Sequence, residues 1–256
     1  MLTEEQILKS TWWADKNWPE KSITEIEQYQ PASYLRLFIT QQSLTAGAQK
    51  RLIDSWCKLL PTLSELNYLW FPSRVTQQMF DAACQMPNLE GLYIKWSGIQ
   101  RLDLLKNNTV LKHFHLGSSS KIESITPLTG LKAIETLELE QLNKITDFSP
   151  VFTLHNLLGL GLDGSMWTTQ KIDTLRGVEN LNQLQYLSLA NSKIKDKSFD
   201  PLLKLNNLVR FSCSWNYPEE EFDKLKALPA LKYGNIQTSW KEEKSKIADI
   251  IKRKQL

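Results

Sequence analysis

Apolar residues return along this chain in a short motif, L-x-x-L-x-L, whose second half alternates apolar and outward-facing positions as in a β-strand. From Leu66 onward, successive copies begin 23, 22, 23, 23, 27, 24 and 23 residues apart. One repeat cannot bury its leucines alone, so this period predicts stacked repeats that close one continuous core. The copies are Tyr34/Leu37/Ile39, Leu66/Leu69/Phe71, Leu89/Leu92/Ile94, Leu111/Phe114/Leu116, Ile134/Leu137/Leu139, Leu157/Leu160/Leu162, Leu184/Leu187/Leu189, Leu208/Phe211/Cys213 and Leu231/Gly234/Ile236.

A second pattern follows these motifs in most repeats. An apolar residue recurs at every third position, and this period favours extended chain or 3₁₀ turns over α-helices. Segments 45–60 and 75–86 instead carry apolar residues at helical spacing and predict amphipathic helices. The period-three runs are Ile122/Ile125/Leu128/Leu131, Ile145/Phe148/Val151/Leu154, Ile172/Leu175/Val178/Leu181 and Phe222/Leu225/Leu228/Leu231.

On the leading motif and the phrases ESITPLTGL and TDFSPVFTL, residues 34–238 resemble a leucine-rich repeat solenoid. Residues 86–232 are similar to short internalin-like repeats, whereas the two helix-bearing repeats before them resemble the ribonuclease-inhibitor type. The resemblance implies an α/β solenoid, a right-handed superhelix of about nine repeats with a curved parallel β-sheet on its concave face. The family often has Asn at the ninth repeat position. This chain has Ser97, Ser119 and Ser192 there, with Asn143 close to it, so we expect less regular turns.

The pattern divides the chain into three parts. Residues 1–33 are expected to form a helical N-terminal cap, residues 34–239 the solenoid, and residues 240–256 a basic helical tail. The cap is expected to cover the first leucines with Trp12, Trp13 and Trp18. The tail is expected to begin at Trp240 and to place Ile247, Ile250 and Ile251 on one face.

Composition narrows the class of protein. The 256 residues are 41% hydrophobic and 23% charged, as in a soluble globular protein. Segment 241–256 carries the whole net charge of +3, and a neutral body argues against nucleic-acid binding. No apolar run approaches the ~18 residues of a membrane span, and the first residues lack the features of a secretory signal. Three scattered cysteines favour a reducing, cytoplasmic setting, and we expect a bacterial monomer without membrane contact.

Two candidate chemical motifs have simpler explanations. The G-x-G-x-x-G run at Gly159, Gly161 and Gly164 lies within a predicted strand, where a dinucleotide-binding loop is not expected. His113 and His115 face the concave side beside acidic residues of the next strand, which is a weak zinc pattern because every repeat strand aligns its residues this way. No nucleophile motif is present, so we expect no enzymatic activity, catalytic residue, metal or cofactor.

The outward positions of the strands predict a binding surface. Tyr68, Trp70 and Tyr93 are expected to form one exposed aromatic patch, and Glu138 to face solvent near two glycines that leave a hollow. Aromatic anchors beside charge indicate a protein–protein interaction module, such as an inhibitor or immunity-type binder that uses the concave face. Binding of a carbohydrate or small ligand on the aromatic patch is the alternative, and a metal-dependent hydrolase is a third reading. The predicted partner-binding residues are Tyr68, Trp70, Tyr93, Trp96, His113, His115, Glu138, Glu140, Asp163 and Tyr186.

Overall fold

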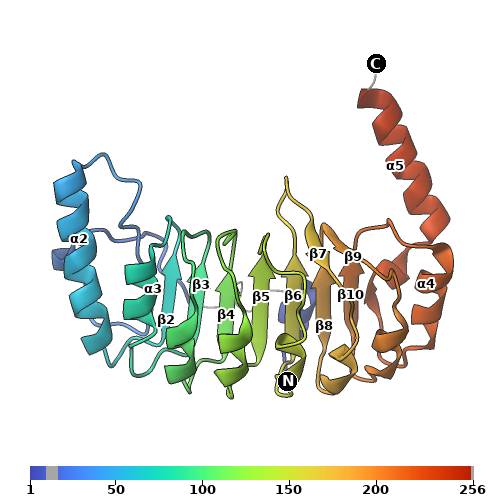
Figure 1. Cartoon of the computed structure of the whole chain (residues 1–256), viewed down its shortest axis with the longest axis horizontal. Helices are drawn as coiled ribbons and strands as arrows, with labels where there is room; N and C mark the ends of the chain where they lie inside the picture. Colours follow the sequence, from blue (N-terminus) through green and yellow to red (C-terminus); the bar gives the residue numbers. More distant parts are fainter. Residues whose placement is uncertain (10–16, 255–256) are drawn as a thin grey trace.

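The computed structural model describes residues 1–9 and 17–254, and within them the predicted repeats form a parallel sheet of nine strands. The strands follow one another along the array in chain order (Figure 1), except that β7 and β9 pair separately as a two-stranded sheet. The strands of the large sheet are β1 (Tyr34–Arg36), β2 (Tyr68–Phe71), β3 (Gly91–Ile94), β4 (His113–Leu116), β5 (Thr136–Glu140), β6 (Gly159–Asp163), β8 (Tyr186–Leu189), β10 (Arg210–Cys213) and β11 (Tyr233–Gly234). The small sheet is made of β7 (Gln170–Ile172) and β9 (Ser192–Ile194).

Strand pairing places equal motif positions side by side. Leu137 of β5 pairs with Phe114 of β4 on one side and with Leu160 of β6 on the other, and all three side chains are fully buried. Neighbouring repeats therefore stack their apolar rows into one core along the array. The opposite side of the large sheet, which carries the outward motif positions, is called the concave face below.

The segments between strands are mostly 3₁₀ turns, as the period of three predicts. The two amphipathic helices are confirmed as α2 (Ala46–Leu59) and α3 (Gln77–Ala83). One difference is α4 (Glu219–Lys224), a short α-helix where a period of three was expected; it has three glutamates in its first turn, where the helix dipole favours negative charge. The 3₁₀ segments are η1 (Ile26–Gln28), η2 (Leu60–Thr62), η3 (Asp103–Asn107), η4 (Thr126–Gly130), η5 (Val151–Thr153), η6 (Val178–Asn180), η7 (Asp200–Lys204), η8 (Leu225–Ala227) and η9 (Asn235–Gln237).

Serines satisfy part of the backbone in the turns after the strands. The Ser97 and Ser119 hydroxyls lie 2.7 Å apart, and the Ser119 hydroxyl donates to the Gly117 carbonyl at 2.9 Å. In the 27-residue repeat that begins at Leu157, the buried Gln170 amide oxygen accepts from the Leu142 N–H at 2.8 Å and so satisfies a backbone group of the turn. The ladder is therefore mixed in residue type, in line with the expected irregularity of the turns.

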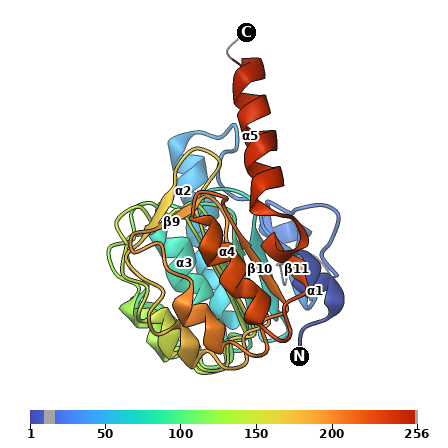
Figure 2. The ribbon, with the colours of Figure 1, turned by 90° about the vertical axis from the view of Figure 1, so that its right-hand side faces the viewer.

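The N-terminal residues contact both ends of the array. Helix α1 (Glu4–Lys9) lies by the C-terminal strands (Figure 2): the Leu2 N–H donates to Gln185 Oε1 at 3.1 Å, and the Tyr233 hydroxyl donates to Glu4 at 2.8 Å. At the other end of the sheet, the Arg36 guanidinium donates to the Glu20 carbonyl at 2.8 Å. The segment expected to cap the first repeat is thus divided between two places. Trp12 and Trp13 lie outside the described residues.

The predicted tail helix is α5 (Trp240–Lys254), which projects away from the array (Figures 1 and 2). The Trp240 indole N–H donates to the Tyr217 carbonyl at 2.9 Å and joins the helix to the last repeat. Ile247 and Ile250 are exposed, and the side chain of Ile251 lies outside the described part of the chain. None of the helices in the described ranges has the length and apolar character that crossing a membrane requires.

Candidate functional site

The concave face brings most of the predicted aromatic residues together in a row. Register pairs Trp70 with Tyr93 and Tyr93 with His115 on consecutive strands. The Trp70 and Tyr93 rings meet edge to face with centroids 5.0 Å apart, and Tyr93 stacks on His115 at 4.3 Å. Tyr68 stacks on Tyr34 of the preceding strand at 4.6 Å. These side chains therefore lie next to one another on consecutive strands, as predicted.

The aromatic row is partly covered by other parts of the same chain: Tyr93 is buried, and Tyr68 and Trp70 are partly buried. The prediction that the three side chains form one exposed patch is therefore wrong. Trp18 packs edge to face on Trp70 with centroids 5.4 Å apart, and the Arg36 guanidinium lies 4.3 Å from the Trp70 ring centroid. Tyr93 is only 8% exposed. Because Arg36 and His115 already occupy faces of Trp70 and Tyr93, the row does not offer the open platform that stacking a sugar requires.

The centre of the concave face is a buried hydrogen-bonded group. His115 Nδ1 lies 2.6 Å from Glu138 Oε2, and the Tyr186 hydroxyl donates to Glu138 Oε1 at 3.1 Å. Tyr186 is fully buried, and its ring lies over Gly159, which fills the hollow expected there. Burial and the nearby Glu138 charge raise the pKa of Tyr186. The expectation that Glu138 faces solvent is wrong, because its carboxylate is held between these two partners.

The histidine pair does not gather a metal-binding set. His113 is buried, and its Nδ1 lies 2.9 Å from Thr136 Oγ1. In the part of the chain that the structure describes, no group of three or more His, Cys, Asp or Glu side chains is arranged to hold a metal ion. The geometry of the two histidines is that of structural hydrogen bonding between strands.

An acidic pair lies at the carboxyl ends of β5 and β6. Glu140 pairs in register with Asp163, and both side chains remain partly accessible. Asp163 Oδ1 accepts from the Ser188 hydroxyl at 2.9 Å and from the Ala190 N–H at 2.6 Å. Burial raises the pKa of Asp163 to about 7. The two hydrogen bonds lower this pKa, and the negative charges of Glu138 and Glu140 raise it further.

Replacement of Asp163 by asparagine is expected to change how stability depends on pH. The pKa of Asp163 is raised from 3.8 to about 7 in the folded state, so the protonated carboxyl stabilises the native state. This contribution to the free energy of unfolding is fully present below pH ~4 and is lost as the pH rises through 7. Asparagine keeps an accepting oxygen for Ser188 and carries no charge. Urea unfolding should therefore show Asp163→Asn gaining about 1 to 2 kcal/mol relative to the wild type between pH 5 and pH 8. A difference that is equal at the two pH values would contradict the shifted pKa.

Comparisons with known proteins agree with this geometry. No protein-family model matches the chain, and no curated protein matches it. Among solved structures, an internalin of Listeria monocytogenes is similar with a TM-score of 0.56 and 20% identity, over 79% of this chain and 53% of that one. A leucine-rich repeat protein of Leptospira interrogans is similar with a TM-score of 0.52 and 16% identity, over 84% of this chain and 65% of that one. The chain has the leucine-rich repeat fold. It spans between about half and two thirds of the length of these two relatives.

The remaining chemical motifs are parts of the leucine-rich repeat scaffold. Gly159 and Gly161 lie inside β6, and the chain continues after Gly164 into a turn and β7, with no helix to receive a phosphate. Burial raises the pKa of the Cys57 thiol to about 11 and also raises the pKa of Cys84, which opposes a nucleophilic role for both.

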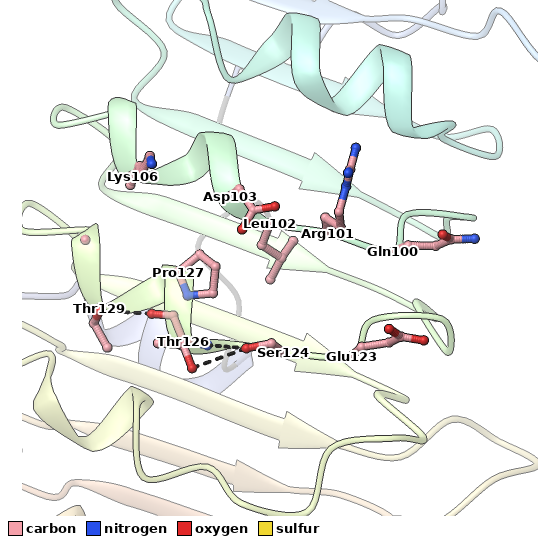
Figure 3. A pocket seen from close by; sticks show the side chains of 11 residues that line it. Gln100, Arg101, Leu102, Asp103, Lys106, Glu123, Ser124, Thr126, Pro127 and Thr129 are labelled. Atoms are coloured by element: carbon pink, nitrogen blue, oxygen red, sulfur yellow. Dashed lines mark hydrogen bonds between the residues drawn. The ribbon is translucent and has the colours of Figure 1, made fainter.

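A surface groove of about 580 Å³ lies between η3 and η4 (Figure 3). Its walls carry both charge signs, with Arg101 and Asp103 on one repeat and Glu123 on the next. A smaller groove of about 270 Å³ follows between Glu123 and Pro150, one repeat further along. Such grooves recur because adjacent 3₁₀ segments pack side by side. The groove is therefore a feature of the repeat array and not an assembled site.

The most exposed apolar residues of the leucine-rich repeat array are not among the predicted partner-binding residues. Met166 and Trp167 are 86% and 90% exposed in the turn between β6 and β7. The available signal was the 27-residue step between Leu157 and Leu184, which is longer than the other steps counted from Leu66. Of the predicted residues, Trp96, Glu140 and Asp163 lie on the same side of the array as this turn, at or beyond the carboxyl ends of their strands. Trp96 is partly buried, with the Arg74 guanidinium 5.8 Å from its ring centroid.

Proposed function

We propose that this leucine-rich repeat chain is a non-enzymatic protein-interaction module that binds a protein partner at the carboxyl edge of its concave face. The observation that carries the proposal is the difference in accessibility across that face. Tyr93, Glu138 and Tyr186 are buried in contacts within the chain, whereas Glu140 and Asp163 at the strand ends are only partly buried. A partner can therefore reach the edge without displacing the contacts behind it.

The acidic pair gives this edge a preference for partner charge. Glu140 and Asp163 lie on adjacent strands, and both are near the buried Glu138. A basic segment of the partner would relieve repulsion among these three carboxylates and would favour the ionised form of Asp163. A binder of this kind acts by covering part of its partner, as an inhibitor or immunity protein does.

The test starts from capture of the partner by pull-down, followed by titration of purified Glu140→Ala against it. Because edge charges mainly steer encounter, the variant should bind with a slower on-rate and a flatter salt dependence than the wild type. Glu220→Ala, on the exposed side of α4, is the matched control and should behave as the wild type. Equal salt dependence for the wild type and Glu140→Ala would contradict binding at this edge.

A further inference from the structure

The turn between β6 and β7 is an insertion into the repeat. The step from Leu157 to Leu184 is 27 residues, against 22 to 24 for the others counted from Leu66. Residues 164–168 rise above the edge of the sheet (Figure 1), while Leu162 before them and Ile172 after them are buried core positions. The core is thus complete on both sides of the turn. In solenoids, extra residues within one repeat form loops on one face, which is often the binding face.

The turn is closed by hydrogen bonds at its base. The Ser165 N–H donates to the Thr168 carbonyl at 2.9 Å, and the Ser165 hydroxyl accepts from the Thr168 N–H at 3.1 Å. The Gly164 N–H donates to the Ala190 carbonyl at 2.8 Å, and a Cβ at Gly164 would lie 2.2 Å from the Asn191 carbonyl oxygen. Only glycine fits this approach. The backbone of the turn is therefore restrained before any partner binds, which lowers the entropy cost of binding.

The tip presents two adjacent large apolar side chains. Met166 and Trp167 are almost fully exposed, and within the described residues the Trp167 ring contacts no other aromatic ring. Tryptophan is the residue type most enriched at the energetic centres of protein interfaces, and methionine adapts to irregular apolar surfaces. Neither side chain contributes to the core of the chain. Two adjacent large apolar side chains exposed in this way are typical of an interaction site.

Two exposed lysines lie on the strands next to the turn. Lys171 of β7 and Lys193 of β9 are in register and both exposed, and neither forms an ion pair with any described residue. Like charges on neighbouring strands repel, so a partner carboxylate would stabilise them. The chain enters the turn from the acidic end of β6, at Asp163, and leaves it into the lysine pair. The turn therefore separates an acidic from a basic surface.

We propose that the Met166–Trp167 turn is the anchor of the interaction, inserting into an apolar pocket of a protein partner that carries carboxylates opposite Lys171 and Lys193. This inference rests on the proposed protein-binding function and adds the position of its energetic centre. A protein is a better occupant than an anionic membrane, because Glu140 and Asp163 beside the turn would be repelled by anionic lipid. A protein surface can present both charge signs at the required places.

The test uses the full chain, with its partner captured from a lysate of the cells that produce it and then purified. Trp167→Ala should weaken binding by at least about thirtyfold in calorimetric titration, as expected for the centre of an interface. Leu203→Ala removes another exposed apolar side chain, on η7, and should leave the affinity unchanged. Benzoylphenylalanine at position 167 should crosslink to the purified partner, and the same probe at position 203 should not.

The role of Lys171 and Lys193 is tested with two double variants that change the net charge equally. Lys171→Glu/Lys193→Glu should weaken binding most at low salt, whereas Lys204→Glu/Lys232→Glu, with the same change in net charge at exposed positions elsewhere, should not. Unchanged affinity in Trp167→Ala with an effect in Glu140→Ala would overturn the anchor and keep the proposed function. Unchanged affinity in both would overturn both. Failure to capture any protein, Trp167-dependent binding to phosphatidylglycerol vesicles, or self-association lost in Trp167→Ala would each overturn the anchor as proposed.

Discussion

Replacement of Leu137 by alanine is expected to lower the free energy of unfolding by about 2 to 5 kcal/mol. The side chain is fully buried between Phe114 and Leu160 on the two neighbouring strands, so its removal leaves a cavity that neither repeat can close. Urea denaturation followed by circular dichroism measures the loss. The matched control is Leu203→Ala, which makes the same chemical change at a side chain that is 36% exposed.

Leu203→Ala should lower the free energy of unfolding by less than about 1 kcal/mol, because this side chain buries less apolar area in the folded chain. Similar losses at Leu137 and Leu203 would contradict the assignment of Leu137 to the core row. The comparison therefore tests the strand register on which the concave face and its edge are defined.

Replacement of Gly159 by alanine is expected to destabilise the chain by about 1 to 3 kcal/mol through overpacking. A Cβ at this position would lie 2.3 Å from Tyr186 Cε1 and 2.4 Å from Tyr186 Cζ. The ring is fully buried and hydrogen-bonded to Glu138, so it cannot move aside without losing that bond. Thermal and urea unfolding of the variant should both show the loss.

Gly161 provides the control within the same strand. A Cβ there would meet Asp163 Oδ2 at 3.3 Å and Glu138 Cγ at 3.5 Å, contacts that small side-chain shifts can relieve. Gly161→Ala should therefore change stability by no more than about 0.5 kcal/mol. If the two alanine variants unfolded at the same urea concentration, Tyr186 would not fill the space over Gly159.

The repeat core could be predicted from the sequence because its signal is local and repeated. The alternation around Leu137 and Leu160 identifies strands, and the period near 23 residues stacks them. The 3₁₀ segments followed from the period of three in the same way. At 219–224 that period did not distinguish a 3₁₀ turn from α4, because Phe222 and Leu225 are buried in either conformation.

The packing of other parts of the chain against the aromatic row could not be predicted in this way. Contacts such as Trp18 with Trp70 join residues far apart in the chain and leave no periodic pattern. The filling of the hollow by Tyr186 had a sequence signal, because Gly159 and Tyr186 occupy the same outward position on adjacent strands. The exposure of Trp167 depends on the shape of the turn, and the sequence signal for it was only the length of one repeat.

The divided N-terminal segment changes how this array should come apart. A linear solenoid frays from its ends, since each repeat is held only by its neighbours. Here the Arg210 guanidinium donates to the Ile7 carbonyl across 203 positions of sequence, and the Tyr233 hydroxyl reaches Glu4 across 229. The Glu20 carbonyl, on the same N-terminal segment, is held by Arg36 of the first strand. The two ends of the array are thereby attached to one N-terminal segment, and attachments that join distant repeats favour unfolding as one cooperative unit.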